Sequence, residues 1–107
     1  MTTLETLKAA RLKIADEGRW TFGEYARNRN EGPVAPNSPK AYCWCAIGAL
    51  CVVTRCSAKT ILLHPAYDAL ANIVPRRSIH DFNDSKPHHA VLAAFDEAIA
   101  KLEHPNG

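Results

Sequence analysis

The chain lacks any apolar run long enough to cross a membrane, and it lacks the apolar segment of a secretion signal near its start. Its longest stretch without a charged side chain lies between Lys40 and Arg55. That stretch is shorter than the roughly 20 apolar residues that a transmembrane helix needs. Residues 1–18 mix apolar and charged positions, which is typical of an amphipathic helix rather than of a signal peptide. These absences predict a cytoplasmic protein with no membrane partner.

An excess of charge of one sign is also missing. Thirteen Lys and Arg stand against eleven Asp and Glu, which gives a net charge of +2. A balance this even does not predict nucleic acid or an acidic membrane as a partner. The apolar fraction of 47% over 107 residues is enough for one hydrophobic core. We therefore expect a single helical domain over residues 1–107.

The cysteines lack a spacing suited to zinc, since they stand at positions 43, 45, 51 and 56, whereas zinc ligands usually pair two to four residues apart on a turn. On one helix Cys43 and Cys45 point about 160° apart. Cys43 and Cys51 lie about 12 Å apart along the axis, beyond the ~7 Å between Cα atoms that a disulfide spans. Only Cys51 with Cys56 could pair. We expect free, buried thiols, and we predict no metal and no cofactor.

The stretch from Ser38 to Arg55 predicts the element around which the rest packs. Ser38 is a suitable N-cap, and Pro39 suits the first position of a helix. Apolar residues then point in every direction, as in a helix that others enclose. Gly48 inside a helix costs about 0.5–1 kcal/mol relative to Ala, and the close approach of another helix would offset that cost. We predict a buried helix over about residues 39–55.

Helical spacing of apolar residues recurs elsewhere in the chain. It predicts helices over residues 3–17 and about 87–103. Ser57 is a candidate cap for a short helical turn through residues 61–63, and Pro65 suits the start of another helix that His64 caps and Pro75 ends. The expected fold is an all-α, compact single-domain bundle of about five helices around the buried central helix.

The segment after the first helix carries two agreeing signals for a further helix start. Thr21 and Glu24 fit a capping box, in which each side chain accepts a backbone N–H near the other. Trp20 and Tyr25 occupy the flanking positions of a hydrophobic staple. The pattern predicts a helix from about residue 21 to residue 28.

Two polar segments without periodicity, 28–37 and 76–86, predict loops that are free to bind a partner. For Asn83 and Asp84 a structural role competes with this one, because short polar side chains can hold a turn and cap the following helix. The sequence does not say whether the two loops share one cleft. The candidate binding residues are Arg27, Arg29, Arg76, Arg77, His80, Asn83 and Asp84.

Two further hypotheses use parts of the same set. A cysteine-dependent enzyme or small-molecule site would use Cys45 as nucleophile, His80 as base, and Asn83 or Asp84 to orient that base. A thiol packed in mid-helix, with no helix N-terminus nearby to lower its pKa, would be inert, so we favour a protein that is not an enzyme. Nucleic-acid binding through the four arginines lacks a helix-turn-helix signature.

Several motifs together resemble a known family. They are Trp20, Gly-Pro at 32–33, Cys-Ala-Ile-Gly-Ala-Leu at 45–50, Phe-Asn-Asp at 82–84 and Ala-Ile at 98–99. Their order is similar to that of a family of uncharacterised small bacterial and phage proteins, a domain of unknown function with a Cys-Ala-x-Gly-Ala-Leu helix motif and a later Asn-Asp. The resemblance covers about Trp20 to Ile99. It implies a bacterial origin, in a phage or mobile element, and no assigned reaction.

Taken together, these patterns favour a small intracellular helical protein that binds another macromolecule. A protein partner is expected, and a host protein that is blocked by binding would suit a phage origin. The sequence leaves the partner and the oligomeric state open.

Overall fold

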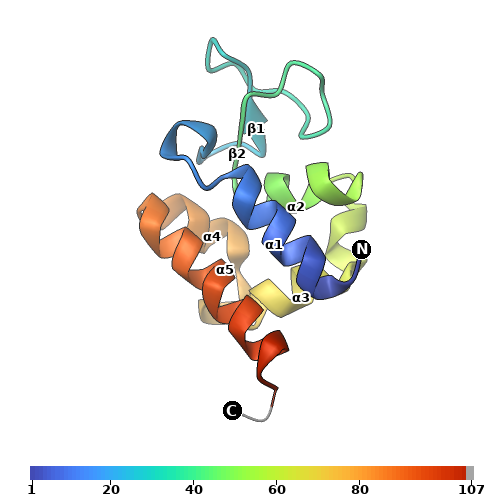
Figure 1. Ribbon diagram of the computed structural model, residues 1–107. Coiled ribbons are helices and arrows are strands. Elements are labelled where there is room, and N and C mark those ends of the chain that lie inside the picture. The colour runs from blue at the N-terminus through green and yellow to red at the C-terminus, as the bar shows by residue number, and fades with distance from the viewer. Residues whose placement is uncertain (106–107) are drawn as a thin grey trace.

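The computed structural model describes residues 1–105 of the chain. Within them, five α-helices and a two-stranded sheet form one predominantly helical domain (Figure 1). The helices are α1 (Thr3–Lys13), α2 (Ala46–Thr54), α3 (Pro65–Ala71), α4 (Ile79–Ser85) and α5 (His88–Glu103). Single turns of 3₁₀ helix are η1 (Glu17–Arg19), η2 (Thr60–Leu63) and η3 (Pro75–Arg77), and the strands are β1 (Ala26–Arg27) and β2 (Cys43–Trp44). The expected helical fold class with about five helices is confirmed.

Helix α1 packs against α2, α5 and α3, so the core lies between these four elements. Figure 1 shows the strand pair at one end of the molecule and the C-terminal part of α5 at the other. Fully buried side chains from the packed elements include Leu7, Leu50, Leu70 and Phe95. None of the helices within residues 1–105 is both long and apolar enough to cross a bilayer. The domain therefore consists of a helical body with a small β-hairpin at one end.

The predicted central helix is buried, but it begins later than expected. Helix α2 starts at Ala46, and residues 46–51 are all buried. The predicted start of this helix at residue 39, which was based on Ser38 and Pro39, was wrong. The chain from Tyr42 to Cys45 is instead held in an extended conformation by hydrogen bonds to other backbone groups. Tyr42 N–H donates to the Arg27 carbonyl at 2.8 Å and Cys45 N–H to the Tyr25 carbonyl at 3.1 Å. Long-range strand pairing overrides the local capping signal here.

The predicted helix over residues 21–28 is also wrong. Thr21 N–H donates to the Trp44 carbonyl at 3.0 Å, and Ala26 and Arg27 pair antiparallel with Trp44 and Cys43. These bonds use backbone groups that a helix would need. The Thr21 side chain is likewise committed elsewhere, because its Oγ1 accepts from Arg27 Nε at 3.1 Å.

Gly48 shows why the extended segment and α2 must meet closely. A Cβ built on Gly48 would lie 2.0 Å from the carbonyl oxygen of Tyr25. The predicted close approach is therefore real, but the neighbour is the backbone of Tyr25 and not another helix. Only glycine leaves room for this contact.

Residues 76–86 were expected to form a loop, and most of them form α4 instead. Ser78 caps this helix, since its Oγ accepts from Asp81 N–H at 3.3 Å. Ile79 and Asn83, one helical turn apart, are its buried residues. Because one of these two is polar, the apolar periodicity of the helix is hidden in the sequence.

Local signals placed the remaining helices well. His64 Nδ1 accepts from Ala66 N–H at 3.0 Å and thereby caps α3, as predicted. Ser57 Oγ accepts from Thr60 N–H at 3.0 Å at the start of η2. Helix α5 lies where expected, whereas α1 ends at residue 13 and α3 at residue 71, both earlier than their patterns indicate.

Candidate functional site

The buried side-chain amide of Asn83 joins three segments of the chain. Its Oδ1 accepts from Trp20 Nε1 at 2.8 Å and from Ala46 N–H at 3.0 Å. Its Nδ2 donates to the Thr21 carbonyl at 3.1 Å and to Asp84 Oδ1 at 3.1 Å. Ala46 is the first residue of α2, so Asn83 satisfies a free N–H at the start of that helix. The expectation that Asn83 caps the helix after it was wrong; it serves α2 instead.

The structure brings Cys45, His80 and Asp84 together around one small hollow. This hollow has a volume of about 120 Å³ and is also lined by Asn83 and residues 23–25. Nε2 of His80 lies 3.6 Å from Oδ2 of Asp84. Asp84 does not cap α5 as expected either, because its Oδ1 accepts from Gly23 N–H at 3.1 Å. Residue types that suit nucleophilic catalysis thus meet here.

The position of Cys45 differs from the prediction in an important respect. Cys45 is the N-cap of α2, not a mid-helix residue, and its Sγ accepts from Gly48 N–H at 3.3 Å. Burial nevertheless raises the pKa of the thiol to about 11, and the charge of Asp84 acts in the same direction, while backbone N–H groups oppose both. A thiol with this pKa stays protonated at neutral pH, when a nucleophile must be a thiolate. The thiol is therefore suited to capping the helix rather than to catalysis.

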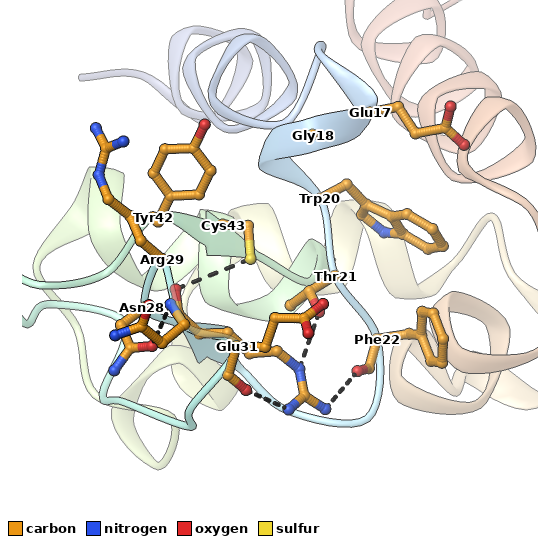
Figure 2. Close-up of a pocket in the computed structure, with 12 residues that line it drawn as sticks. Glu17, Gly18, Trp20, Thr21, Phe22, Asn28, Arg29, Glu31, Tyr42 and Cys43 are labelled. Atoms are coloured by element: carbon orange, nitrogen blue, oxygen red, sulfur yellow. Dashed lines mark hydrogen bonds between the residues drawn. The ribbon is translucent and has the colours of Figure 1, made fainter.

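A larger hollow lies at the hairpin end of the molecule. It has a volume of about 640 Å³ and is lined by residues 17–18, 20–22, 27–31 and 42–43 (Figure 2). A neighbouring hollow of about 520 Å³ shares Asn28, Arg29, Asn30 and Tyr42 with it. Because they share these residues, we treat the two hollows as one surface and call it the hairpin groove.

Two cations flank the ring of Tyr42 in the hairpin groove, and a third lines the same hollow. The guanidinium carbons of Arg19 and Arg29 lie 4.2 Å and 4.6 Å from the centre of the Tyr42 ring, within the range of cation–π contacts. Lys40 lines the same 520 Å³ hollow, and no acidic side chain does. Within the described part of the chain, none of these three cations forms an ion pair. This end of the groove is suited to an anionic group.

Arg27 has a different role from Arg29, although the sequence grouped them. Its guanidinium donates to Thr21 Oγ1 at 3.1 Å, to the Glu31 carbonyl at 3.0 Å and to the Phe22 carbonyl at 3.2 Å (Figure 2). These bonds connect the two sides of the hairpin groove. Arg27 is therefore a structural residue of the groove, and Arg29 is left exposed to meet a ligand.

Aromatic side chains lie on the other side of the groove. The ring centres of Trp20 and Phe22 are 5.8 Å apart, and that of His88 is 5.5 Å from Trp20. Figure 2 shows Trp20 and Phe22 across the hollow from Tyr42 and Arg29. Phe22 is 57% exposed, so part of its ring is open to a ligand in the groove. The groove thus has a cationic side and an aromatic side.

The remaining predicted residues lie outside both hollows. Arg77 donates to Asn72 Oδ1 and, at 2.9 Å, to Asp68 Oδ1. Arg76 is exposed and has a left-handed backbone, with φ of 57°. The two predicted polar segments therefore do not form one cleft: residues 28–31 line the hairpin groove, whereas residues 80, 83 and 84 line the small hollow.

Sequence reasoning missed Arg19, Lys40 and Tyr42 on the cationic side of the groove, and Trp20 and Phe22 on its aromatic side. The first three come from the end of η1 and from the segment before β2. Arg19 meets Tyr42 because the chain after η1 forms a bridge to β2, between Trp20 and Trp44, and Arg29 reaches the same ring because β1 pairs with β2. The single local signal was Lys40 two positions before Tyr42. Over residues 1–105, no cluster of three or more His, Cys, Asp or Glu residues has the arrangement of a metal site.

The fold and the groove define a small helical domain with a recessed, partly cationic surface at its hairpin end. The chain belongs to a family of unknown function, DUF6197, whose model matches residues 1–101. Neither a curated protein nor a solved structure matches the chain.

Proposed function

We propose that this protein is a binding protein that holds an acidic segment of a partner protein in the hairpin groove. The observation that carries the proposal is that Arg19, Arg29 and Lys40 line one hollow together with Tyr42, whose ring the two arginines flank. All three cations are exposed, and no carboxylate lines their hollow. Arginine and lysine in this setting make charge-assisted hydrogen bonds with carboxylates.

An acidic peptide fits the groove better than a nucleic acid does. The side chains of Glu17 and Glu31 belong to residues that line the larger hollow. A continuous phosphate backbone would meet both carboxylates, whereas a peptide can place its acids at the cationic side alone. The net charge of +2 also gives little general attraction for a polyanion.

The setting of this binding rests on the resemblance to bacterial and phage proteins. We propose that the protein is encoded by a phage or mobile element and acts in the bacterial cytoplasm. Its partner is then a host protein that is blocked when its acidic segment occupies the groove.

The test uses a short glutamate-rich peptide with a fluorescent label, titrated with the full chain and followed by fluorescence anisotropy. Arg29→Gln should weaken binding by about tenfold, because one charged hydrogen-bond donor is worth about 1.4 kcal/mol or more. Arg76→Gln is the matched control, since Arg76 is also exposed but lines neither hollow of the groove. It should leave the affinity unchanged.

Salt provides a second readout, because exposed ionic contacts are screened as ionic strength rises. Peptide affinity should fall between low salt and physiological salt. The proposal is wrong if the peptide does not bind at low salt, if both variants lose affinity equally, or if an oligonucleotide of the same length binds more tightly.

A further inference from the structure

We infer that the segment bound in the hairpin groove carries an apolar side chain beside its acidic ones, with the apolar side chain seated on Phe22 and Trp20. This inference rests on the proposed function and names the partner motif more closely. It starts from the pairing of a cationic side and an aromatic side in one groove.

The aromatic side is held in place rather than loosely attached. The Trp20 indole donates to buried Asn83, Thr21 N–H donates to the Trp44 carbonyl, and the Phe22 carbonyl accepts from Arg27. Three consecutive residues are thus each tied to a different partner. The 57% exposed ring of Phe22 is presented to solvent by a fixed backbone.

The middle of the groove separates the two kinds of contact. In Figure 2 the side chain of Glu31 is drawn in the middle of the view, between Trp20 and Phe22 on one side and Tyr42 and Arg29 on the other. Arg27 keeps its charge at the aromatic side, but it already donates three hydrogen bonds to the protein, so it has fewer free N–H groups for a ligand carboxylate than Arg19 and Arg29 have. The carboxylate of Glu31, which also lines the hollow, would repel such a ligand group. An apolar side chain placed there covers the rings of Phe22 and Trp20 without that repulsion.

The two sides therefore recognise different parts of one segment. Arg19, Arg29 and Lys40 bind the carboxylates, and Phe22 with Trp20 binds the apolar residue. A ligand that carries only one of the two features makes only one of the contacts and binds more weakly, and specificity is such a difference in affinity.

The experiment compares three labelled peptides of equal length with the full chain. The first carries a glutamate run and a neighbouring leucine, the second replaces the leucine by serine, and the third keeps the leucine but replaces the glutamates by glutamine. The first peptide should bind about fivefold to tenfold more tightly than the second, as expected for burying one apolar side chain. The third should bind more weakly than either.

Variants of the protein assign the gain to Phe22. Phe22→Ser should abolish the difference between the first two peptides and leave the affinity for the second unchanged, whereas Phe22→Leu should keep most of the difference. Leu63→Ser is the control, because Leu63 is 87% exposed and does not line the groove. Thermal unfolding followed by circular dichroism shows whether each variant remains folded.

The outcomes separate this inference from the proposed function. If the first two peptides bind equally and both remain sensitive to Arg29→Gln, the apolar contact is refuted and the acidic-segment proposal stands. If the leucine peptide binds more tightly but Phe22→Ser and Leu63→Ser both leave that gain intact, the apolar residue binds elsewhere and the inference is wrong. If no peptide binds, both fail.

Discussion

The indole N–H of Trp20 donates to the Oδ1 of Asn83 at 2.8 Å, across 63 positions of the sequence. The same oxygen accepts the first backbone N–H of α2, so one amide fixes both the aromatic side of the groove and the start of a core helix. A hydrogen-bonded tie of this kind couples the shape of the groove to the stability of the helical body.

Asn83→Ala should destabilise the fold by roughly 3 kcal/mol or more, because it leaves the N–H groups of Trp20 and Ala46 buried without this acceptor. Urea unfolding followed by tryptophan fluorescence measures the change. Asn72→Ala is the control, since Asn72 is exposed and bonds only with Arg77 through its side chain in the described structure. If the two variants unfold at the same urea concentration, the hydrogen bonds of the Asn83 amide do not stabilise the fold as described.

Gly48→Ala should lower the free energy of unfolding by about 3 kcal/mol or more, because the added methyl group would overlap the Tyr25 carbonyl. This is the upper end of the cost of inserting extra atoms into a packed core. The backbone cannot move aside without breaking the bond from Cys45 N–H to the same oxygen. Gly18→Ala provides the comparison, since a Cβ there would lie 3.3 Å from its nearest neighbour, a side-chain oxygen of Asp16, and not within bonding distance of a backbone carbonyl. Chemical denaturation of both variants tests the difference; a Gly48→Ala protein as stable as Gly18→Ala would contradict the close approach.

Cys45 should react slowly with iodoacetamide in the folded protein. With a pKa of about 11, only roughly one thiol in 3,000 is a thiolate at pH 7.5, and the side chain is 5% exposed. Half-buried Cys43 and Cys56 should be labelled first, and labelling of Cys45 should rise with pH toward 11. Mass spectrometry of digests after timed labelling gives the order, and labelling in urea gives the reference. Rapid labelling of Cys45 at neutral pH would restore the nucleophile hypothesis.

Local chemistry decided which parts of the fold the sequence could predict. The His64 cap of α3, the hydrogen bond between Ser57 and Thr60 at η2 and the apolar spacing of α5 are short-range signals, and the helices that they predict lie where expected, although Leu102 near the end of α5 is 41% exposed. The start of α2 depends instead on Asn83, 37 positions away, and on strand pairing with β1. Two good local signals, at Ser38 and at Thr21, were overridden by such distant partners.

The candidate sites follow the same rule. Cys45, His80 and Asp84 were grouped by residue type, and the hairpin and α4 bring them together, but the raised pKa of the thiol depends on burial that spacing does not reveal. Arg29 was identified as a candidate because it stands in a polar loop. Its neighbours Arg19, Lys40 and Tyr42 were not, since their meeting with Arg29 depends on long-range backbone pairing, of β2 with β1 and with Trp20.

The three internal hydrogen bonds of Arg27 have a kinetic and an entropic consequence. Since they link both walls of the groove before any ligand arrives, the cost of about 0.5–1.5 kcal/mol per immobilised side chain falls on folding rather than on association. Under the proposed function, binding would then be a rigid docking step with little backbone rearrangement. Loosening Arg27 would lower the affinity by making the empty surface heterogeneous, in addition to any effect of its charge.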